Sequence, residues 1–404
     1  MSFNIALSGI NAINKQLTIT SHNIANGATI GFKASRANFA TMMAGDQGNG
    51  TSVASVTQSI GGGSAGVFST GVKLDAAIQG NGFFVTRNAE GNTLFTRAGI
   101  FHRSQDGYIV DTFGHRVQGY AMGGAYGDLH TPADTDPAKA STRLSYAGNL
   151  SASAAAPQVD KFDKANANSY SKKITSTVYD SLGGQHQVEQ YFVKLSNTPA
   201  SSIPTKSAEV LNTYAVYYVV DDKPASNTPV LLKFDEHGAL KDPSVFGTFS
   251  VSGPGFAKGD IKVDYTGTTQ YASDTTTTTN QADGHQSGVP GEPMLDKRGN
   301  VVVQYSNGEK RTLGTLALAT FANPDGLEAV GDTAWTASTA SGNPLLGTPG
   351  AGGLGELVPG ALELSNADVT NELVTMMAAQ RNYQANSKVL SIENQMMQSL
   401  MQAL

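Results

Sequence analysis

The side chains that most often perform chemistry are few in this sequence, and their spacing assembles no site. The chain of 404 residues has no cysteine, so it offers no disulfide, no thiolate metal ligand and no cysteine nucleophile. Its seven histidines are scattered, at positions 22, 102, 115, 130, 186, 237 and 285, without the His-Glu-x-x-His spacing of zinc enzymes. We therefore predict no catalytic residue, no metal site and no cofactor.

Two glycine-rich stretches resemble phosphate-binding loops only superficially. Gly61 to Gly66 lacks the Gly-Lys-Ser/Thr ending that such a loop needs. Gly80-Asn81-Gly82 lacks the third glycine and the βαβ unit of a dinucleotide site, so both stretches are typical of turns. Asp180 and the pair Asp221-Asp222 are separate loop carboxylates and indicate no paired acid and base. These patterns predict that the chain is not an enzyme.

Charge and hydropathy exclude further classes of partner. The formal net charge is -6, with a sequence pI near 5.6, which argues against binding to nucleic acid or to anionic membranes. The segment from Met1 to Gly27 has one basic residue, Lys15, and no apolar core typical of a cleaved signal peptide. No apolar run is long enough to span a bilayer, so we expect no membrane insertion. An exported chain of this kind would use a route that keeps its N-terminus.

With no chemical site apparent, the elements that would position side chains become the candidates for function. A stripe of mostly apolar residues opens the chain at alternating spacings of three and four, as in a coiled-coil seam. It predicts a helix of about 24 residues, roughly 36 Å long, starting near Ser2 and ending near Gly27. An amphipathic helix packed on its own domain is the alternative. The stripe comprises Phe3, Ala6, Ile10, Ile13, Leu17, Thr20 and Ile24.

A second stripe, with a seven-residue period, runs to the other end of the chain. Ser365 to Asp368 fits a capping box and predicts a helix from about Asn366. The period comprises Leu362, Val369, Met376, Tyr383, Leu390, Met397 and Leu404, with Leu373 and Met401 at the second seam position. Polar residues interrupt that second position at Gln380, Ser387 and Asn394.

Pairing the two terminal helices as a coiled coil is the economical arrangement, because each has an apolar face and few charges. No charged residue follows Glu393. Isolated helices of this kind are marginal in water. We therefore expect both termini to be largely disordered in the monomer and to fold when neighbouring subunits bury them.

The region between the helices reads as antiparallel β-structure without a βαβ rhythm. The sequence thus predicts a mainly β fold with α-helical termini, nested as several domains. We expect an inner coiled-coil domain (1–28 and 364–404), a connector (29–71), an intermediate β domain (72–145 and 284–363) and an inserted outer β domain (146–283). Glycine-rich Gly61-Gly62-Gly63 and the Thr275 to Thr279 run mark boundaries. Predicted strands are 172–179, 187–195, 213–220, 230–234, 245–251, 261–265, 301–305 and 312–321.

Motifs at both ends resemble one family, the axial proteins of the bacterial flagellum, which form its rod and hook. The N-terminal signature is Ser21-His22-Asn23-Ile24-Ala25-Asn26 followed by Thr29, Gly31, Phe32 and Lys33, and it continues in 74–85, 95–99, 106–108 and 117–120. The closing motif runs from Ser365 through Glu372-Leu373 to Gln380-Arg381-Asn382-Tyr383, with Ala367 where the family pattern has Val. The resemblance covers roughly 1–120 and 361–404.

The resemblance implies a non-enzymatic subunit of a tubular polymer outside the cell, exported through the flagellar type III apparatus. The large central insertion favours a hook subunit over a distal rod subunit. Implied partners are further copies of the chain, the distal rod, the hook cap, the hook–filament junction protein and the export apparatus. The alternatives are a distal rod subunit, a phage-tail-like or surface adhesin protein, and a secreted hydrolase.

Individual residues carry two interpretations each. Phe3 and Leu7 are similar to a short export-gate element, although Phe3 also lies on the helical seam. Asn23 and Asn26 would end the first helix, contact a neighbour, or do both. Arg381 and Tyr383 would bond across the paired helices or face solvent, and Lys33 with Arg36 would be a solubilising pair.

Overall fold

The chain folds into two compact β-rich units, one of which carries a helix from each end of the chain. The computed structural model describes residues 2–44, 47–60, 66–131, 134–157, 159, 161–195, 212–225, 228–241, 246–251 and 259–403. We call 1–133, 291–304 and 310–404 the terminal unit, and 134–290 with 305–309 the central unit. The predicted mainly β fold with helical termini that pack on each other is confirmed.

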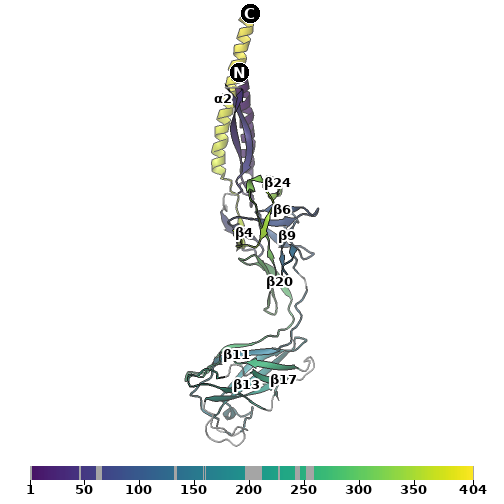
Figure 1. Ribbon diagram of the computed structural model, residues 1–404, viewed down its shortest axis with the longest axis vertical. Helices are drawn as coiled ribbons and strands as arrows, with labels where there is room; N and C mark the ends of the chain where they lie inside the picture. The colour runs from purple at the N-terminus through teal and green to yellow at the C-terminus, as the bar shows by residue number, and fades with distance from the viewer. Residues whose placement is uncertain are drawn as a thin grey trace. The chain divides into compact units, whose positions relative to one another are not determined.

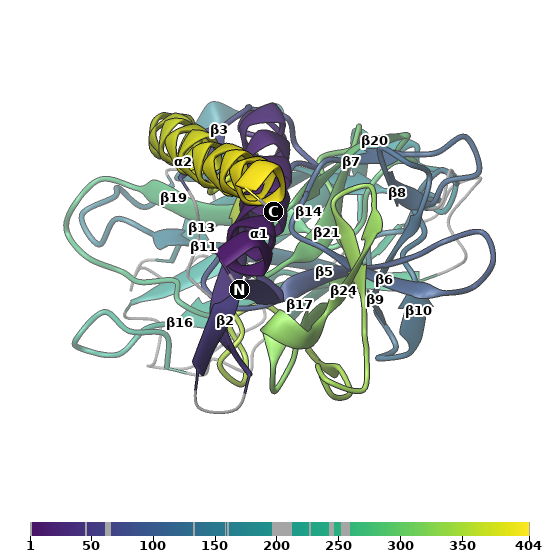
Figure 2. The same cartoon turned by 90° about the horizontal axis from the view of Figure 1, so that it is seen from above.

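Helices α1 (Ser2–Ala25) and α2 (Val369–Ala403) lie side by side in the terminal unit (Figures 1 and 2). They run antiparallel, because Gly27 at the end of α1 lies against the Val369 side chain, while Gly9 lies against Asn386. The predicted length of about 24 residues for the first helix is confirmed.

The start of α2 differs from the prediction. Asp368 Oδ1 accepts hydrogen bonds from the backbone N–H groups of Thr370 (2.9 Å) and Asn371 (3.2 Å), so Asp368 is the capping residue. Ser365 Oγ accepts only from the backbone of Ala367. The predicted start near Asn366 was therefore three residues early, because a serine and an aspartate both fit the cap pattern and the aspartate takes the position.

A long hairpin of β1 (Ser35–Ala44) and β2 (Gln47–Gln58) packs along α1. Ser8 Oγ accepts a hydrogen bond from the backbone N–H of Thr51 (3.1 Å), which fixes the hairpin to the helix. The segment 29–71, predicted as a connector, thus contains regular structure. Its strands are rich in Ser and Thr and remain partly exposed, so they lack the apolar alternation that signals a half-buried strand. The predicted Gly61-Gly62-Gly63 boundary lies outside the described residues.

The β-structure of the terminal unit is built from both sides of the central insertion. Its 13-stranded sheet has the order β20-β21-β22-β9-β5-β6-β25-β24, with β10, β23, β26, β7 and β8 attached, while β27 pairs β4 and β28 pairs β3. The strands are β3 (Val67–Ser69), β4 (Ala76–Gln79), β5 (Phe83–Arg87), β6 (Thr93–Thr96), β7 (Phe101–Arg103), β8 (Ile109–Asp111), β9 (Arg116–Ala121), β10 (Tyr126–Asp128), β20 (Pro290–Leu295), β21 (Asn300–Tyr305), β22 (Lys310–Leu316), β23 (Leu318–Thr320), β24 (Glu328–Gly331), β25 (Ala334–Thr336), β26 (Leu345–Gly347), β27 (Glu356–Pro359) and β28 (Ala361–Glu363). The predicted strand 312–321 divides into β22 and β23.

Both faces of this sheet are buried, which follows from the alternation of side chains along a strand. Phe84 of β5 and Leu318 of β23 join one apolar cluster. Phe83 and Val85, on the opposite face, join a second cluster that includes Trp335. Each face of the sheet therefore carries its own apolar cluster.

The central unit contains two sheets with one shared core. One has the order β17-β18-β11-β19 and the other β12-β13-β14-β15, with β16 paired to β14. All pairs are antiparallel except β11 with β18, which differs from the purely antiparallel prediction. The strands are β11 (Arg143–Asn149), β12 (Lys172–Tyr179), β13 (Gln185–Lys194), β14 (Thr213–Val220), β15 (Lys223–Pro224), β16 (Val230–Lys233), β17 (Phe246–Val251), β18 (Gly259–Asp264) and β19 (Thr276–Ala282).

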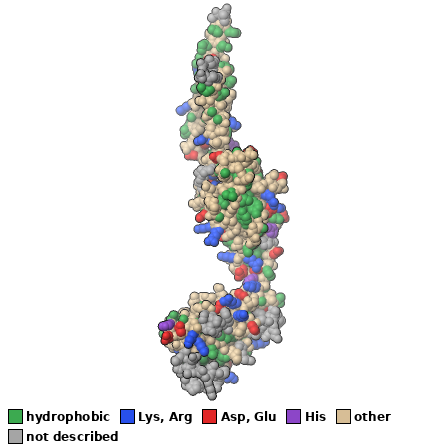
Figure 3. Space-filling model, in the orientation of Figure 1, with side chains coloured by type: hydrophobic (Ala, Val, Ile, Leu, Met, Phe, Trp, Pro, Cys, Tyr) green, Lys and Arg blue, Asp and Glu red, His purple; other side chains and the backbone are tan. Residues whose placement is uncertain are grey.

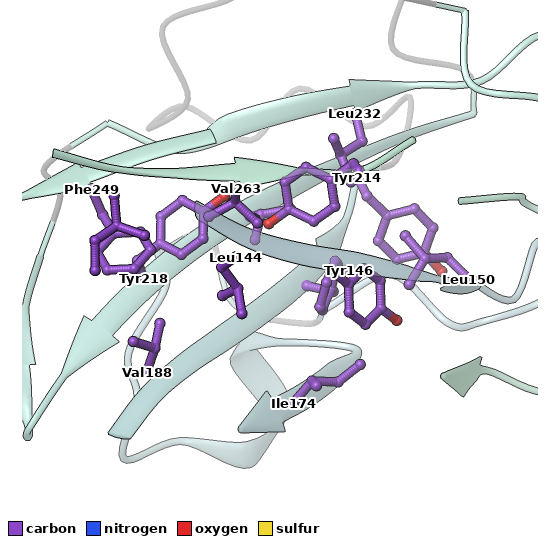
Figure 4. Packing of buried hydrophobic residues seen from close by; sticks show 14 of the residues in the cluster. Leu144, Tyr146, Leu150, Ile174, Val188, Tyr214, Tyr218, Leu232, Phe249 and Val263 are labelled. Atoms are coloured by element: carbon purple, nitrogen blue, oxygen red, sulfur yellow. Dashed lines mark hydrogen bonds between the residues drawn. The ribbon is translucent and has the colours of Figure 1, made fainter. Parts of the chain in front are cut away.

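The core of the central unit is rich in tyrosine (Figure 4). Tyr218 and Tyr265 share a hydrogen bond of 2.6 Å, and Tyr265 donates to Gln190 Oε1 (2.8 Å), so these two buried hydroxyls are satisfied across the two sheets. The threonine run predicted as a boundary instead forms β19, because β-branched residues suit an exposed edge strand.

Candidate functional site

The seam predicted for α1 is only partly covered within one chain. Ala6, Ile13 and Thr20, seven residues apart, are buried against neighbouring elements. The seam residues between them are Ile10, Leu17 and Ile24, and all three are half-buried. Phe3 is 43% exposed, as is Leu7 at 41%, so both residues proposed for export face outward at the start of the helix.

Helix α2 is almost entirely uncovered. Among its side chains that the structure describes, Ala379 alone is buried, while Met376 and Leu390 are half-buried. The remaining predicted packing residues are Leu373 (47% exposed), Tyr383 (38%), Met397 (64%) and Val369 (40%, beside Gly27). A hollow of about 240 Å³ lies between Leu17 and Tyr383. The two helices of one chain therefore meet loosely and leave most of the α2 stripe open.

Gln380 and Arg381 are exposed on α2, in the part of the closing motif that the sequence singled out. Within the described residues, Arg381 and Tyr383 make no hydrogen bond across to α1. Tyr383 borders the hollow beside Leu17 and is 38% exposed, and Arg381 is exposed, so both keep surface open to a neighbour.

Asn23 joins three elements at the far end of α1. It is buried at 1% exposure, and its Nδ2 donates to the Ser35 carbonyl and to Glu372 Oε1, both at 2.8 Å. Its Oδ1 accepts from the backbone N–H of Ser35 at 3.0 Å. The side chain therefore ties the end of α1 to the start of β1 and to the first turn of α2.

The turn after α1 is closed by the remaining N-terminal motif residues. Asn26 Nδ2 donates to the His22 carbonyl, and Thr29 Oγ1 donates to Asn26 Oδ1, both at 3.0 Å, while Ala25 at the helix end is exposed. The Phe32 ring is buried beside His22. These local bonds end the helix and turn the chain into the hairpin.

Gly31 is required by both conformation and space. Its φ is +70°, and a Cβ there would lie 2.6 Å from the backbone N of Ala98. Its own N–H donates to the Glu363 carbonyl at 2.9 Å. Any other residue would push this turn away from the sheet.

A buried ionic triad lies directly behind that turn. Lys33 Nζ is 2.7 Å from Glu363 Oε1, and Arg97 Nη1 is 3.1 Å from Glu363 Oε2. The side chains of Lys33 and Glu363 have no exposed surface, and that of Arg97 is 3% exposed. Arg97 also donates to the Gly80 carbonyl (2.9 Å) and lies over the Phe83 ring. The triad thus joins the end of the N-terminal motif, the sheet and β28.

The triad corrects the prediction for Lys33, which is no part of a solubilising pair, although Arg36 is exposed. Burial lowers the pKa of Arg97, and the attraction of the Glu363 carboxylate opposes that shift. Two cations share one carboxylate, so Glu363 is the residue on which the balance of buried charge depends.

Arg97, Glu363 and Glu372 were missed as site residues from the sequence. Arg97 stands within 95–99, a stretch quoted for the family resemblance, which is a signal that could have found it. Glu372 stands in the closing motif quoted for the same resemblance and so carried the same signal, whereas Glu363 lies in a short strand outside the quoted motifs.

A polar hollow of about 850 Å³ opens beside Ser35 and Glu372, the two residues that Asn23 bonds. Its lining includes Arg36, Asp325 and Glu372, together with backbone at the bases of β1 and β2. Such a lining suits a polar protein segment better than an apolar small molecule, because small-molecule sites are mostly apolar.

One titratable cluster lies in the central unit. His186 Nδ1 is 2.5 Å from Asp221 Oδ2, and its Nε2 is 3.4 Å from Asp180 Oδ2. Burial lowers the pKa of His186, but the hydrogen bonds to Asp221 and Asp180 outweigh it and raise the pKa overall. Hydrogen bonds, first from the Gly184 N–H, lower the pKa of Asp180. The cluster stabilises a charged imidazolium at the β12–β13 turn.

Over the described residues, no three His, Asp or Glu side chains gather into a group that could hold a metal ion. Neither described helix combines the length and apolar character that crossing a bilayer requires.

Three family profiles match segments of the chain. They are the flagellar hook protein FlgE/F/G D1 domain at 77–152, the flagellar basal body protein FlaE D2 domain at 149–285, and the flagellar basal body rod FlgEFG protein C-terminal region at 358–403. The D2 match falls within the central unit, and the C-terminal match includes all of α2.

Whole-length relatives agree with these profiles. The chain is 35% identical to the flagellar hook protein FlgE of Salmonella typhimurium and 34% identical to that of Escherichia coli K12, each over 99% of both proteins. It is 29% identical to the FlgE of Borreliella burgdorferi, over 98% of this chain and 97% of that relative. The crystal structure of Helicobacter pylori flagellar hook protein FlgE2 shares the fold, with a TM-score of 0.52, 14% identity, and coverage of 72% of this chain and 98% of that one.

Proposed function

The chain belongs to the flagellar hook protein family, and we propose that it is the structural subunit of a hook, polymerising head to tail into a curved, flexible tube outside the cell. The matched relatives are named as hook proteins, which supports the hook over the distal rod and over an adhesin or a hydrolase.

The observation that carries this proposal is the amount of apolar surface left open on the helices and the hairpin. Soluble monomers rarely expose apolar residues in such density, and larger open patches mark interaction sites. Figure 3 shows hydrophobic side chains along the helix pair. The exposed apolar residues include Phe3, Ile5 and Leu7 of α1, Phe39, Met42 and Val56 of the hairpin, and Val374, Met377, Val389, Ile392, Met396, Met397, Leu400 and Met401 of α2.

Head-to-tail growth follows from having one copy of each such surface. Contacts between unlike surfaces that do not close into a ring generate an open helical filament. The predicted packing residues of α1 and α2 would then be covered by neighbouring copies. Their scarcity of charge suits the wall of a channel through which unfolded subunits pass.

The layers of the subunit suit a tube that bends while it turns. Asn23 ties the two helices to each other, and the Lys33–Glu363–Arg97 triad ties the turn after α1 to β28 and the sheet, which favours a stiff inner wall. The outer domain, predicted at 146–283, would make smaller polar contacts that slide between copies. This division would let the hook act as a universal joint that transmits torque from rod to filament.

Family membership also suggests the remaining partners. We infer contacts with the distal rod, the hook cap and the hook–filament junction protein, and export through the flagellar type III apparatus without a cleaved signal peptide. Exposed Phe3 and Leu7 are the candidates for the export contact.

Electron microscopy of the purified chain at rising concentration tests the proposal. Tubes of subunits should appear above a critical concentration. A variant in which a short Gly-Ser linker replaces 134–290 should still polymerise, but into straighter or stiffer tubes. A chain that stays monomeric at every concentration, even with tube fragments as seeds, would refute the proposal.

A further inference from the structure

Helix α2 is longer than its partner and extends past it. Gly9 of α1 lies against Asn386 of α2, and the helices are antiparallel, so Ser2 lies opposite position 393. Residues 394–403 of α2 therefore have no α1 beside them, as Figure 1 shows at the C-terminal end. At 1.5 Å per residue this overhang is about 15 Å long.

The face of α2 that meets α1 continues into the overhang. Glu372 and Asn386 contact α1, with buried Ala379 midway between them, and the same seven-residue period reaches Leu400. Half-buried Met376 and Leu390 lie on the adjoining row, which reaches Met397. Leu400 is 63% exposed and Met397 is 64% exposed, because α1 has ended. The overhang thus extends an existing helix-binding stripe.

The chemistry of the overhang differs from that of the paired stretch. No charged residue follows Glu393 in α2, and none precedes Lys15 in α1. Burying these two segments against each other would strip water from no charged side chain, and removing water from a charged side chain is costly. Methionines such as Met396 and Met401 adapt well to a neighbouring surface.

On this basis we propose that the overhang of one subunit binds the first turns of α1 in a second copy of the chain. Phe3, Ile5 and Leu7 are 43, 40 and 41% exposed while α1 is bound to its own α2, so they stay available. The contact repeats between copies the α1–α2 pairing already present within one. It rests on the proposed polymer and names the surface that would join its subunits.

Engineered disulfides test this contact in a chain that has no cysteine of its own. Leu7 lies opposite position 388 by the same pairing, so Leu400 is roughly 18 Å further along the helix. A disulfide needs Cα atoms within about 7 Å. A bond between Leu7→Cys and Leu400→Cys can therefore form only between copies.

The two single variants are mixed, polymerised, oxidised and run on a non-reducing gel. We expect a band at twice the subunit mass in tubes and its loss in dilute subunits. The control mixture pairs Leu7→Cys with Leu182→Cys, an exposed residue of the central unit, and should give no such band. Mixed tubes without the band would overturn the contact, and so would the same band from tubes of Leu400→Cys alone. An unmodified chain that forms no tubes would instead refute the proposed function.

A second variant gives a reading without crosslinking. Leu400→Ser changes a side chain that is uncovered in the single subunit, so the far-UV spectrum and unfolding of the monomer should stay the same. The critical concentration for tube formation should rise severalfold. An unchanged critical concentration would overturn the contact.

Discussion

Replacing Glu363 by Gln should destabilise the terminal unit more than any other conservative change to a charged residue there. The substitution keeps the shape of the side chain but leaves the ammonium of Lys33 and the guanidinium of Arg97 buried without a counter-charge. Removing one partner of a buried ion pair costs about 3–5 kcal/mol. Because two buried cations lose their counter-charge, the free-energy cost of this variant should lie at the upper end of that range.

The order of two variants is the sharper part of this prediction. Lys33→Met leaves Glu363 with Arg97, a balanced pair, so its cost should be clearly smaller than that of Glu363→Gln.

The tryptophan of the chain makes the measurement specific to one unit. Trp335 is the only one in the sequence, is 3% exposed, and lies 5.8 Å from the Phe83 ring that Arg97 covers. Its fluorescence during urea unfolding therefore reports on the terminal unit. With a slope of about 2 kcal/mol per M, the upper end of that range lowers the midpoint for Glu363→Gln by roughly 2 to 2.5 M.

An exposed ion pair supplies the control. Lys73 and Glu292 are 3.2 Å apart, with side chains 53% and 81% exposed, so Glu292→Gln should cost less than about 1 kcal/mol. If the midpoint of Glu363→Gln moved no further than that of Glu292→Gln, or less than that of Lys33→Met, the reasoning would be refuted.

Three other predictions address the turn, the central unit and the helices. Gly31→Ala should lower the free energy of unfolding, read by the same fluorescence, by more than Gly91→Ala, because both have a positive φ but only Gly31 is packed against other backbone; equal losses would contradict this. His186 has a raised pKa, so its contribution to the stability of the central unit should be full below about pH 6.5 and lost as the pH rises through the raised pKa. The free energy of unfolding of His186→Gln in urea, followed by tyrosine signals, should therefore depend less on pH in that window. A pH dependence equal to that of the unmodified chain would exclude the imidazolium. Amide exchange of dilute monomer should be fast from Ile10 to Ile24 and slow in tubes, whereas strong protection in the monomer would show that the helices fold alone.

Periodic patterns predicted the elements that they dominate. The stripe from Phe3 to Ile24 gave the length of α1, and alternation gave β12 and β14 at the predicted residues. The fold class followed from the same patterns, because burial of one face leaves a regular trace in the sequence.

The buried triad of Lys33, Glu363 and Arg97 was not predictable from periodicity. Lys33 follows a helix and precedes Arg36, which is the usual context of a solvated lysine, and its partner Glu363 is 330 positions away along the chain. Nothing local records that distant contact. The hairpin of β1 and β2 was also hidden, because serine and threonine strands packed on a helix lack apolar alternation.

The helix α2 shows a third limit. Its seven-residue apolar period is real, but within one chain the row of Glu372, Ala379 and Asn386 faces α1 as well, and Leu373 stays open. Periodicity identifies a surface to be covered, and it does not say whether the same molecule or another one covers it.

Strand β28 fixes the order in which the molecule can be completed. It pairs with β3, where Leu362 lies opposite Phe68, 294 positions earlier, and it brings Glu363 to two cations that are synthesised long before. Ribosomes make the N-terminal side first, so the terminal unit stays open until about nine-tenths of the chain exists. Such late closure, with long loops to be ordered at once, makes folding slow. That delay provides an interval in which the terminal unit of a newly made chain is still open, as passage through a narrow channel requires.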